Sequence, residues 1–273
     1  MRRNILIPPA EAESGTEQVK VLARGLNVLQ AFVPRNEWLS NQEISERCDL
    51  PRPTVSRLTN SLATLGLLVC SPRHGRYRLS LSALSLGFDA FASASPLAPA
   101  RQALMGFVQK HGGVAIVTER NETSMVCVEA YQREDSLLSV RIFQGSRLPL
   151  AVSAVGRAWF GVASAREQDS VLARLSQRLG DRAAGVIAQL RAESRKLRPD
   201  GVYLGLENLE SGVNGLGVAL CTQGRPTRFA LGSAAPSSHF TAAVMQGQVM
   251  VDFLALRQEI ESLLTPVAAG SLD

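Results

Sequence analysis

Five polar residues between positions 52 and 60 could form hydrogen bonds to a nucleic acid. All five side chains are donors or acceptors and none is acidic: Arg52, Thr54, Ser56, Arg57 and Asn60. Arginine can donate two parallel hydrogen bonds to a guanine edge, and hydroxyl and amide groups can bond to bases or phosphates. This chemistry requires that a helix present these side chains on its outer face, near its start.

The surrounding pattern predicts three helices that would position these side chains. The first runs from Glu17 to Val33 and ends before Pro34, with an apolar face at helical spacing: Val19, Leu22, Leu26, Leu29 and Val33. Ser40 and Glu43 have the spacing of a capping box, which begins a short second helix that ends near Cys48. The third helix ends at Gly66, and its inward residues are predicted to be Val55, Leu58, Leu62 and Leu65.

A basic hairpin is predicted after the third helix. Residues 67–70 have the pattern of a strand, and residues 77–79 have the pattern of the antiparallel strand that returns beside it. The polar loop between them carries Arg73, His74 and Arg76, and His74 fits either a turn position or a DNA contact. A two-stranded wing with arginines at its tip suits contact with phosphates or with the minor groove.

The charge distribution has two possible interpretations. Residues 1–80 carry 11 lysines and arginines against 7 acidic residues, and the segment from Leu50 to Phe88 has five arginines and no acidic residue. The cluster of arginines could be an ordinary solvated surface, and the two short helices could be a simple αα-hairpin. The order of helix, helix, basic helix and basic hairpin favours a winged helix-turn-helix. Arg52 and Arg57 are then expected to contact bases or backbone in the major groove, and Arg73 and Arg76 to act from the wing.

The composition indicates a globular protein of about two domains. Of 273 residues, 45% are hydrophobic and 19% are charged, with a net charge of +5. The four cysteines are far apart, which fits a reducing cytoplasm. No stretch approaches the ~20 apolar residues of a membrane helix, and residues 1–16 are expected to form a disordered leader.

Motifs of enzymes are missing from the sequence. There is no G-x-S-x-G elbow, no H-E-x-x-H pair and no Walker loop, and the glycines at positions 212, 215 and 217 lack the spacing of a nucleotide loop. The three histidines, His74, His111 and His239, are far apart. We therefore expect no enzyme activity, no metal site and no cofactor.

The stretch DLPRPTVSRLTNSLATLGLLVCSPRHGRYRLS resembles the recognition helix and wing of the IclR family of bacterial transcription regulators, and VLARGLNVLQAF is similar to that family's first helix. The likeness covers nearly the whole chain after residue 16. It implies a DNA-binding domain over residues 17–80, a linker helix over 81–96 and an effector-binding domain over 97–273. An ordinary core helix is the alternative interpretation of residues 81–94. A linker helix would help two subunits pair, so that a dimer, or a dimer of dimers, reads a palindromic operator.

The pattern after residue 97 predicts an α+β domain with a roughly six-stranded antiparallel sheet flanked by helices, which resembles the GAF-like domain of the family. The predicted helices are residues 97–111, 154–163, 167–179, 184–197 and 238–263. The predicted strands are residues 114–119, 125–131, 137–143, 202–206, 216–221 and 229–233.

The resemblance also implies where a small molecule would bind. Ser153 could begin the helix after the RLPL segment and leave the amides of Ala154 and Val155 facing an anion. Leu137, Val140 and Leu148 fall where the family lines its pocket with apolar side chains. Family members that bind small oxoacids contact them through an Asp, a Cys and two Ser. The aligned residues in this sequence are Gly205, Gly215, Gly232 and Ala234.

These departures predict a roomier and less polar cup than one for a small oxoacid. The effector is then expected to be a larger, aromatic carboxylate, in a regulator that represses or activates a catabolic operon. Two alternatives stay open: neighbouring side chains could fill the cavity, or the protein could bind DNA without an effector, under the control of a partner. The sequence does not distinguish a regulator controlled by a small molecule from one controlled by a partner.

Overall fold

The computed structural model describes residues 17–32, 37–85, 99–133 and 142–264, and the statements below concern these ranges. The chain divides into two compact units, one on each side of the segment 86–98, and each is described by itself. Of the predicted linker helix, the described part is a short 3-10 turn, Leu81–Leu84, and the rest lies outside the described residues. No helix among the described residues is long and apolar enough to cross a membrane.

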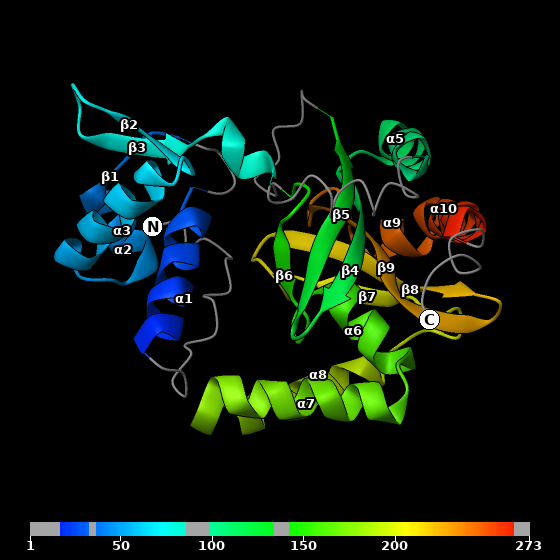
Figure 1. Ribbon diagram of the computed structural model, residues 1–273. Helices are drawn as coiled ribbons and strands as arrows, with labels where there is room; N and C mark the ends of the chain where they lie inside the picture. Colours follow the sequence, from blue (N-terminus) through cyan, green and yellow to red (C-terminus); the bar gives the residue numbers. More distant parts are fainter. Residues whose placement is uncertain (1–16, 33–36, 86–98, 134–141, 265–273) are drawn as a thin grey trace. The chain divides into compact units, whose positions relative to one another are not determined.

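The amino-terminal unit is a helical bundle covered by a small sheet (Figure 1). Its elements are α1 (Glu17–Gln30), β1 (Leu39–Ser40), α2 (Asn41–Cys48), α3 (Arg52–Thr64), β2 (Leu68–Ser71) and β3 (Arg76–Leu79). The three strands pair antiparallel in the order β1-β3-β2. One apolar cluster joins all these elements, and Phe32, Ile44 and Val55 are fully buried in it.

Two predicted helix faces differ from the structure. Leu22 and Leu26 are 66% and 50% exposed, and Leu65 is 72% exposed, although all three were expected to face inward. The buried face of α1 carries Gly25 and Val28, and α2 and α3 pack against this helix. Phe32, just after the helix, is buried in the same apolar cluster as Val28. Leu65 lies beyond the last turn of α3, where the chain turns toward β2.

The carboxy-terminal unit is a six-stranded antiparallel sheet with helices on both faces (Figure 1). The strand order is β6-β5-β4-β9-β8-β7, with bounds β4 Val114–Asn121, β5 Ser124–Gln132, β6 Arg147–Pro149, β7 Tyr203–Leu206, β8 Val213–Thr222 and β9 Arg225–Pro236. One face carries α5 (Ala100–His111), α9 (Ala242–Gln246) and α10 (Gln248–Leu264). The other carries α6 (Ala154–Val162), α7 (Ala165–Leu179) and α8 (Ala183–Ser194).

The predicted six-stranded sheet is confirmed, but one strand and one helix differ. The sixth strand is β6, whereas most of the predicted strand 137–143 lies outside the described residues. The predicted final helix is two helices, because Gly247 ends α9 and α10 begins at the next residue.

The helix α6 lies very close to the sheet because glycines face it. A Cβ atom at Gly217 would lie 2.3 to 2.6 Å from backbone atoms of Ala154 and Val155. A Cβ atom at Gly232 would lie 2.5 Å from Val155 Cγ1. Since real atoms do not approach so closely, only glycine permits this packing.

A charged cluster joins α5 to α10 on the opposite face. Asp252 Oδ2 lies 2.7 Å from Lys110 Nζ and 2.6 Å from His111 Nε2, and Asp252 Oδ1 accepts from Gln248 at 3.1 Å. These contacts lower the pKa of Asp252 to about 2, and the hydrogen bond from Lys110 has the largest effect. The contacts therefore favour the ionised carboxylate in the folded state.

We expect Gly217→Ala to destabilise the protein by about 1 to 3 kcal/mol, because the added methyl group forces α6 away from the sheet. Gly185→Ala is the matched control: Gly185 lies in α8 with nothing within 4 Å of an added Cβ. There the same change is expected to raise stability by up to about 1 kcal/mol, through helix propensity. Urea unfolding measures both, and equal stabilities of the two variants would contradict the close packing of α6.

We expect the stabilisation from Asp252 to depend on pH in one direction. Because the pKa is about 2 in the folded state and 3.8 ordinarily, the stabilisation is present above pH 3.8 and disappears as the pH falls toward 2. The difference in free energy of unfolding between wild type and Asp252→Asn should therefore shrink over that range. Asp169→Asn removes the same charge from an exposed position on α7 and should show a smaller change. Parallel curves for both variants would refute the assignment.

Candidate DNA-binding surface and effector site

The outer face of α3 presents the predicted polar residues. Arg52, Arg57 and Asn60 are exposed, and Thr54 and Ser56 are half-buried. The opposite face is anchored by Val55, Thr59 and Leu62, all buried. The Thr59 hydroxyl lies 3.1 Å from Asn41 Oδ1, to which it donates, and so ties α3 to the start of α2.

The angle between α2 and α3 is held by local backbone contacts. Asp49 ends α2 in the left-handed conformation, with φ of 53°. The Leu50 amide donates to the Ser45 carbonyl at 3.2 Å, and the Ser45 hydroxyl donates back to the Leu50 carbonyl. A tight turn of this kind between two short helices is the defining feature of a helix-turn-helix.

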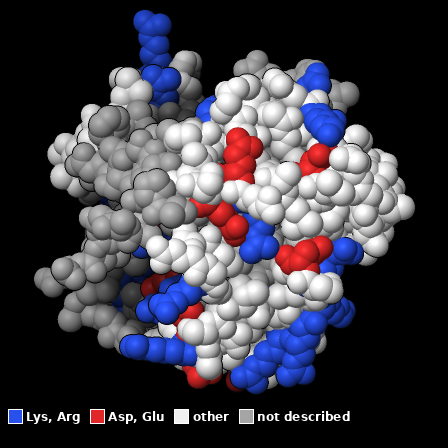
Figure 2. All heavy atoms as spheres, turned by 90° about the vertical axis from the view of Figure 1, so that its right-hand side faces the viewer, with Lys and Arg blue, Asp and Glu red and all other residues white. Residues whose placement is uncertain are grey.

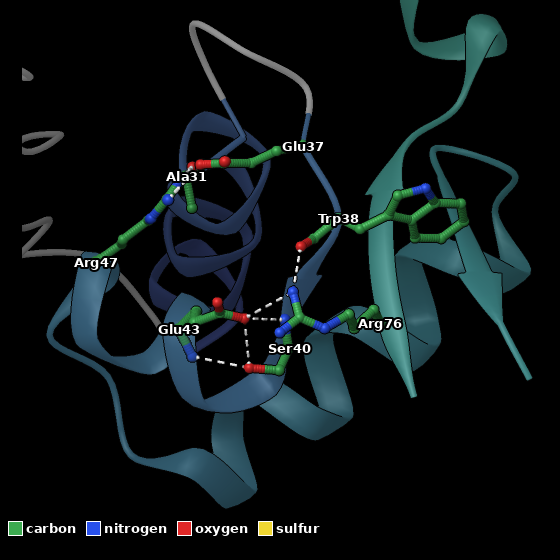
Figure 3. Close-up of polar contacts among 7 residues, drawn as sticks. All are labelled: Ala31, Glu37, Trp38, Ser40, Glu43, Arg47 and Arg76. Carbon is green, nitrogen blue, oxygen red and sulfur yellow. Dashed lines mark hydrogen bonds and ion pairs between the residues drawn. The ribbon is translucent and has the colours of Figure 1, made fainter. Parts of the chain in front are cut away.

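The capping box predicted at the start of α2 is confirmed (Figure 3). The Ser40 hydroxyl accepts from the Glu43 amide at 3.3 Å, and the Glu43 carboxylate accepts from the Ser40 amide at 2.7 Å. Hydrogen bonds from Ser40, and then the charges of Arg76 and Arg47, lower the pKa of Glu43. The carboxylate is therefore ionised in the folded state at neutral pH.

Arg76 lies in the wing, at the start of β3, and its side chain contacts residues of the amino-terminal unit. Its Nη1 donates to the Trp38 carbonyl at 2.7 Å and lies 3.4 Å from Glu43 Oε2, so the guanidinium ties β3 to β1 and to the start of α2 (Figure 3). Asn60 is also partly engaged, because its Oδ1 accepts from the Tyr77 hydroxyl at 2.9 Å. Arg73 and His74 are exposed in the turn of the wing, as expected.

The acid-free stretch of α3 and the wing contrasts with the charge pattern elsewhere. On the face shown in Figure 2, acidic and basic side chains lie side by side. Ion pairs of the carboxy-terminal unit include Arg198–Asp200, Arg228–Glu119 and Arg257–Glu261. Between positions 50 and 85, by contrast, the described chain has only basic charges. An exposed helix face of this kind is suited to the polyanionic backbone of DNA.

In the carboxy-terminal unit, the structure brings most of the predicted effector residues to the start of α6. Ser153 is buried, and its hydroxyl accepts from the Gly156 amide at 3.2 Å. Gly205 faces the Ala154 Cβ, Gly232 faces Val155, and Gly215 pairs with Ala234. Leu148 is buried in the same apolar cluster as Val155. Leu137 and Val140 lie outside the described residues.

The extra room expected at the glycine positions is partly taken up. A side chain at Gly232 would meet Val155 Cγ1, and one at Gly205 would lie 3.3 Å from the Ala154 Cβ. Atoms of α6 therefore lie in space that larger side chains at Gly205 and Gly232 would occupy. The expectation of a roomier cup is wrong at Gly232, because the neighbouring helix fills the volume there.

The sequence analysis missed Arg157, which positions α6. Its side chain is 1% exposed; Nε donates to the Ala151 carbonyl at 3.0 Å and Nη1 to the Tyr203 hydroxyl at 2.7 Å. Glu193 of α8 balances the charge, with Oε2 at 3.5 Å from Nη1. Burial first, and then the hydrogen bond to Glu193, raise the pKa of Tyr203. A single arginine inside the otherwise apolar segment AVGRAWFGV is the signal that could have revealed this role.

A winged helix-turn-helix joined in one chain to an α+β unit is the architecture of a DNA-binding transcription regulator. Two family models match: the IclR helix-turn-helix domain over residues 21–71 and the bacterial transcriptional regulator IclR C-terminal domain over residues 96–253. The chain belongs to the IclR family of transcription regulators, which is not a class of enzymes. In the described residues, no group of three or more His, Cys, Asp or Glu could hold a metal ion.

Relatives and solved structures agree with this family. The HTH-type transcriptional regulator TsaQ1/TsaQ2 of Comamonas testosteroni is 27% identical over 264 residues, which cover 96% of this chain and 94% of that protein. The Pca regulon regulatory protein of Pseudomonas putida is 33% identical over 138 residues, 50% of this chain and 46% of that protein.

Among solved structures, an IclR family transcriptional regulator from Brucella abortus has a TM-score of 0.67 at 27% identity, and the match covers 94% of this chain and 98% of that one. An IclR homolog from Microbacterium hydrocarbonoxydans, complexed with 4-hydroxybenzoate, has a TM-score of 0.65 at 18% identity, with 92% and 100% covered.

We expect Arg57→Ala to weaken binding to operator DNA by at least tenfold without unfolding the protein, because Arg57 is exposed and supports no contact of the core. Fluorescence anisotropy measures the affinity, and circular dichroism checks the fold. Arg191→Ala, an exposed arginine of α8, is the control for loss of one positive charge. Equal affinities of the two variants would remove Arg57 from the DNA-binding surface.

Proposed function

We propose that this regulator binds a roughly palindromic operator as a dimer, or as a dimer of dimers, and that a carboxylate effector held in its carboxy-terminal unit changes its affinity for DNA. The exposed, acid-free outer face of α3 is the observation that carries the first part. One winged helix-turn-helix reads too few base pairs for useful specificity, so two copies on two half-sites are required.

The start of α6 supports the proposal of an anionic effector. The Ser153 hydroxyl accepts from the third amide of the helix, and the first amide, of Ala154, makes no hydrogen bond to a described residue. Free amides at a helix start attract carboxylates through their hydrogen bonds and the helix dipole. The buried Arg157 keeps this helix start in place against β7 and the turn before it.

The apolar surroundings favour an aromatic acid, and a catabolic operon as the target. Leu148 and Val155 belong to one buried cluster, and no acidic or basic side chain replaces the missing polar groups at Gly205, Gly215, Gly232 and Ala234. The family member that holds 4-hydroxybenzoate indicates that the fold can accept such an acid. The relative named as the Pca regulon regulatory protein supports control of a set of genes.

One observation favours a second candidate, a regulator controlled by a partner and not by a small molecule. Val155 and Ala154 already contact the glycine positions where larger side chains are absent. If neighbouring atoms fill the whole cup, no effector can enter. A mobility shift on the DNA upstream of its own and neighbouring genes, repeated with aromatic and aliphatic carboxylates, distinguishes the two candidates.

We expect Ala154→Pro to abolish the response to the acid, because proline removes the first amide of α6 but is tolerated at the first position of a helix. Ala165→Pro is the matched control, since α7 also begins with a serine cap followed by alanine. A saturating acid, at about 100 times its Kd, stabilises the folded state by about 2.7 kcal/mol. Thermal unfolding should show this shift in wild type and in Ala165→Pro only.

Two results would count against the effector site. A full response in Ala154→Pro would place the carboxylate away from the start of α6. No response of wild type to any acid, with operator binding intact, would favour control by a partner.

A further inference from the structure

The outer face of the wing carries Arg78, one of the five arginines between Leu50 and Phe88, for which the sequence predicted no individual contact. The pairing of β2 with β3 places Arg78 opposite Val69, and Trp38 directly precedes β1 on the other side of β3. The Arg78 Cζ lies 4.8 Å from the centroid of the Trp38 ring. Arg78 is exposed, and its guanidinium makes no hydrogen bond or ion pair to a described residue, whereas its backbone pairs with β2. Its charge is therefore oriented by an aromatic ring but is not neutralised.

Arg76 and Arg78 lie on the same face of β3 but differ in what their donors contact. Arg76 uses Nη1 for the Trp38 carbonyl and for Glu43. Arg78 stacks on the ring of the same tryptophan. A stacked guanidinium keeps its in-plane N–H groups available, and these groups match the spacing of phosphate oxygens.

The position of Arg78 fits the path of a DNA backbone. Trp38 precedes Ser40, the cap of α2, by two residues. In helix-turn-helix complexes the first helix of the motif, here α2, crosses the DNA backbone. We propose that Arg78, held by stacking on Trp38, binds a DNA phosphate and fills the role that the sequence suggested for Arg76. This inference rests on DNA binding by the helix-turn-helix.

The two residues have distinct roles in this proposal. Arg78 touches the phosphate, and Trp38 is a positioning residue that holds the guanidinium in place. Loss of Arg78 should remove one phosphate contact, whereas loss of the Trp38 ring should keep the charge but disorder it. The salt dependence of binding separates these effects, because its slope counts the phosphates neutralised.

The experiment measures the affinity of the full chain for a mixed-sequence DNA duplex over a range of salt concentrations. Arg78→Ala is expected to weaken binding about eightfold at ~0.1 M salt and to lower the slope by about 0.9, which corresponds to one phosphate contact. Arg166→Ala, an exposed arginine of α7, removes the same charge and is expected to leave the slope unchanged. Arg78→Gln keeps the stem and a planar head, and provides the same test if the alanine variant unfolds.

Trp38→Ala is expected to weaken binding less than Arg78→Ala and to leave the slope unchanged, while Trp38→Phe restores the affinity. The double variant should bind no more weakly than Arg78→Ala alone, since the ring acts only through Arg78. Equal slopes for Arg78→Ala and Arg166→Ala would overturn the proposal, and so would a loss confined to operator sequence, which indicates a base contact. A wild-type chain that binds no duplex at low salt would overturn DNA binding itself.

Discussion

The first amides of a helix have no acceptors within the helix, and how each helix start meets this requirement shapes both surfaces of this protein. The start of α2 is closed by the reciprocal hydrogen bonds of Ser40 and Glu43. The start of α6 is half closed, because Ser153 accepts only from Gly156. The start of α3 has no side-chain cap, and Pro53 removes one amide. The helices proposed to meet DNA and an anion both lack a reciprocal capping box, a feature that they share with α5 and α8.

Glu43 links local structure to the wing. Its carboxylate caps α2 and also lies beside Arg76 of β3, so one ionised group serves the helix start and the attachment of the sheet. Both partners are about 40% exposed, so the ion pair itself contributes little to stability. The ion pair instead fixes the position of the wing relative to α2. The positions of Arg73 and His74 at the tip follow from that attachment.

In the carboxy-terminal unit, small residues and one buried charge work together. Glycines at 217 and 232 let α6 approach the sheet, which brings Ala154 and Val155 against β8 and β9. Arg157 also fixes this helix, through the Tyr203 hydroxyl and the carbonyl of Ala151. A buried guanidinium is costly unless its donors are satisfied, so its partners constrain the helix to one position. A change at the start of α6 would therefore reach β7 and α8 directly.

The sequence by itself determined the features that depend on near neighbours along the chain. The capping box at Ser40 and Glu43, the serine cap of α6 and the exposed polar face of α3 require only residues within one or two turns. The resemblance to the IclR family supplied the order of the domains, since periodicity alone cannot. Tertiary structure decided which faces are covered: Leu22 and Leu26 have helical spacing, but the buried face of α1 carries Gly25 and Val28. It also gave Arg76 and Arg78 different contacts, because their common partner Trp38 lies about 40 residues earlier and is brought there by strand pairing.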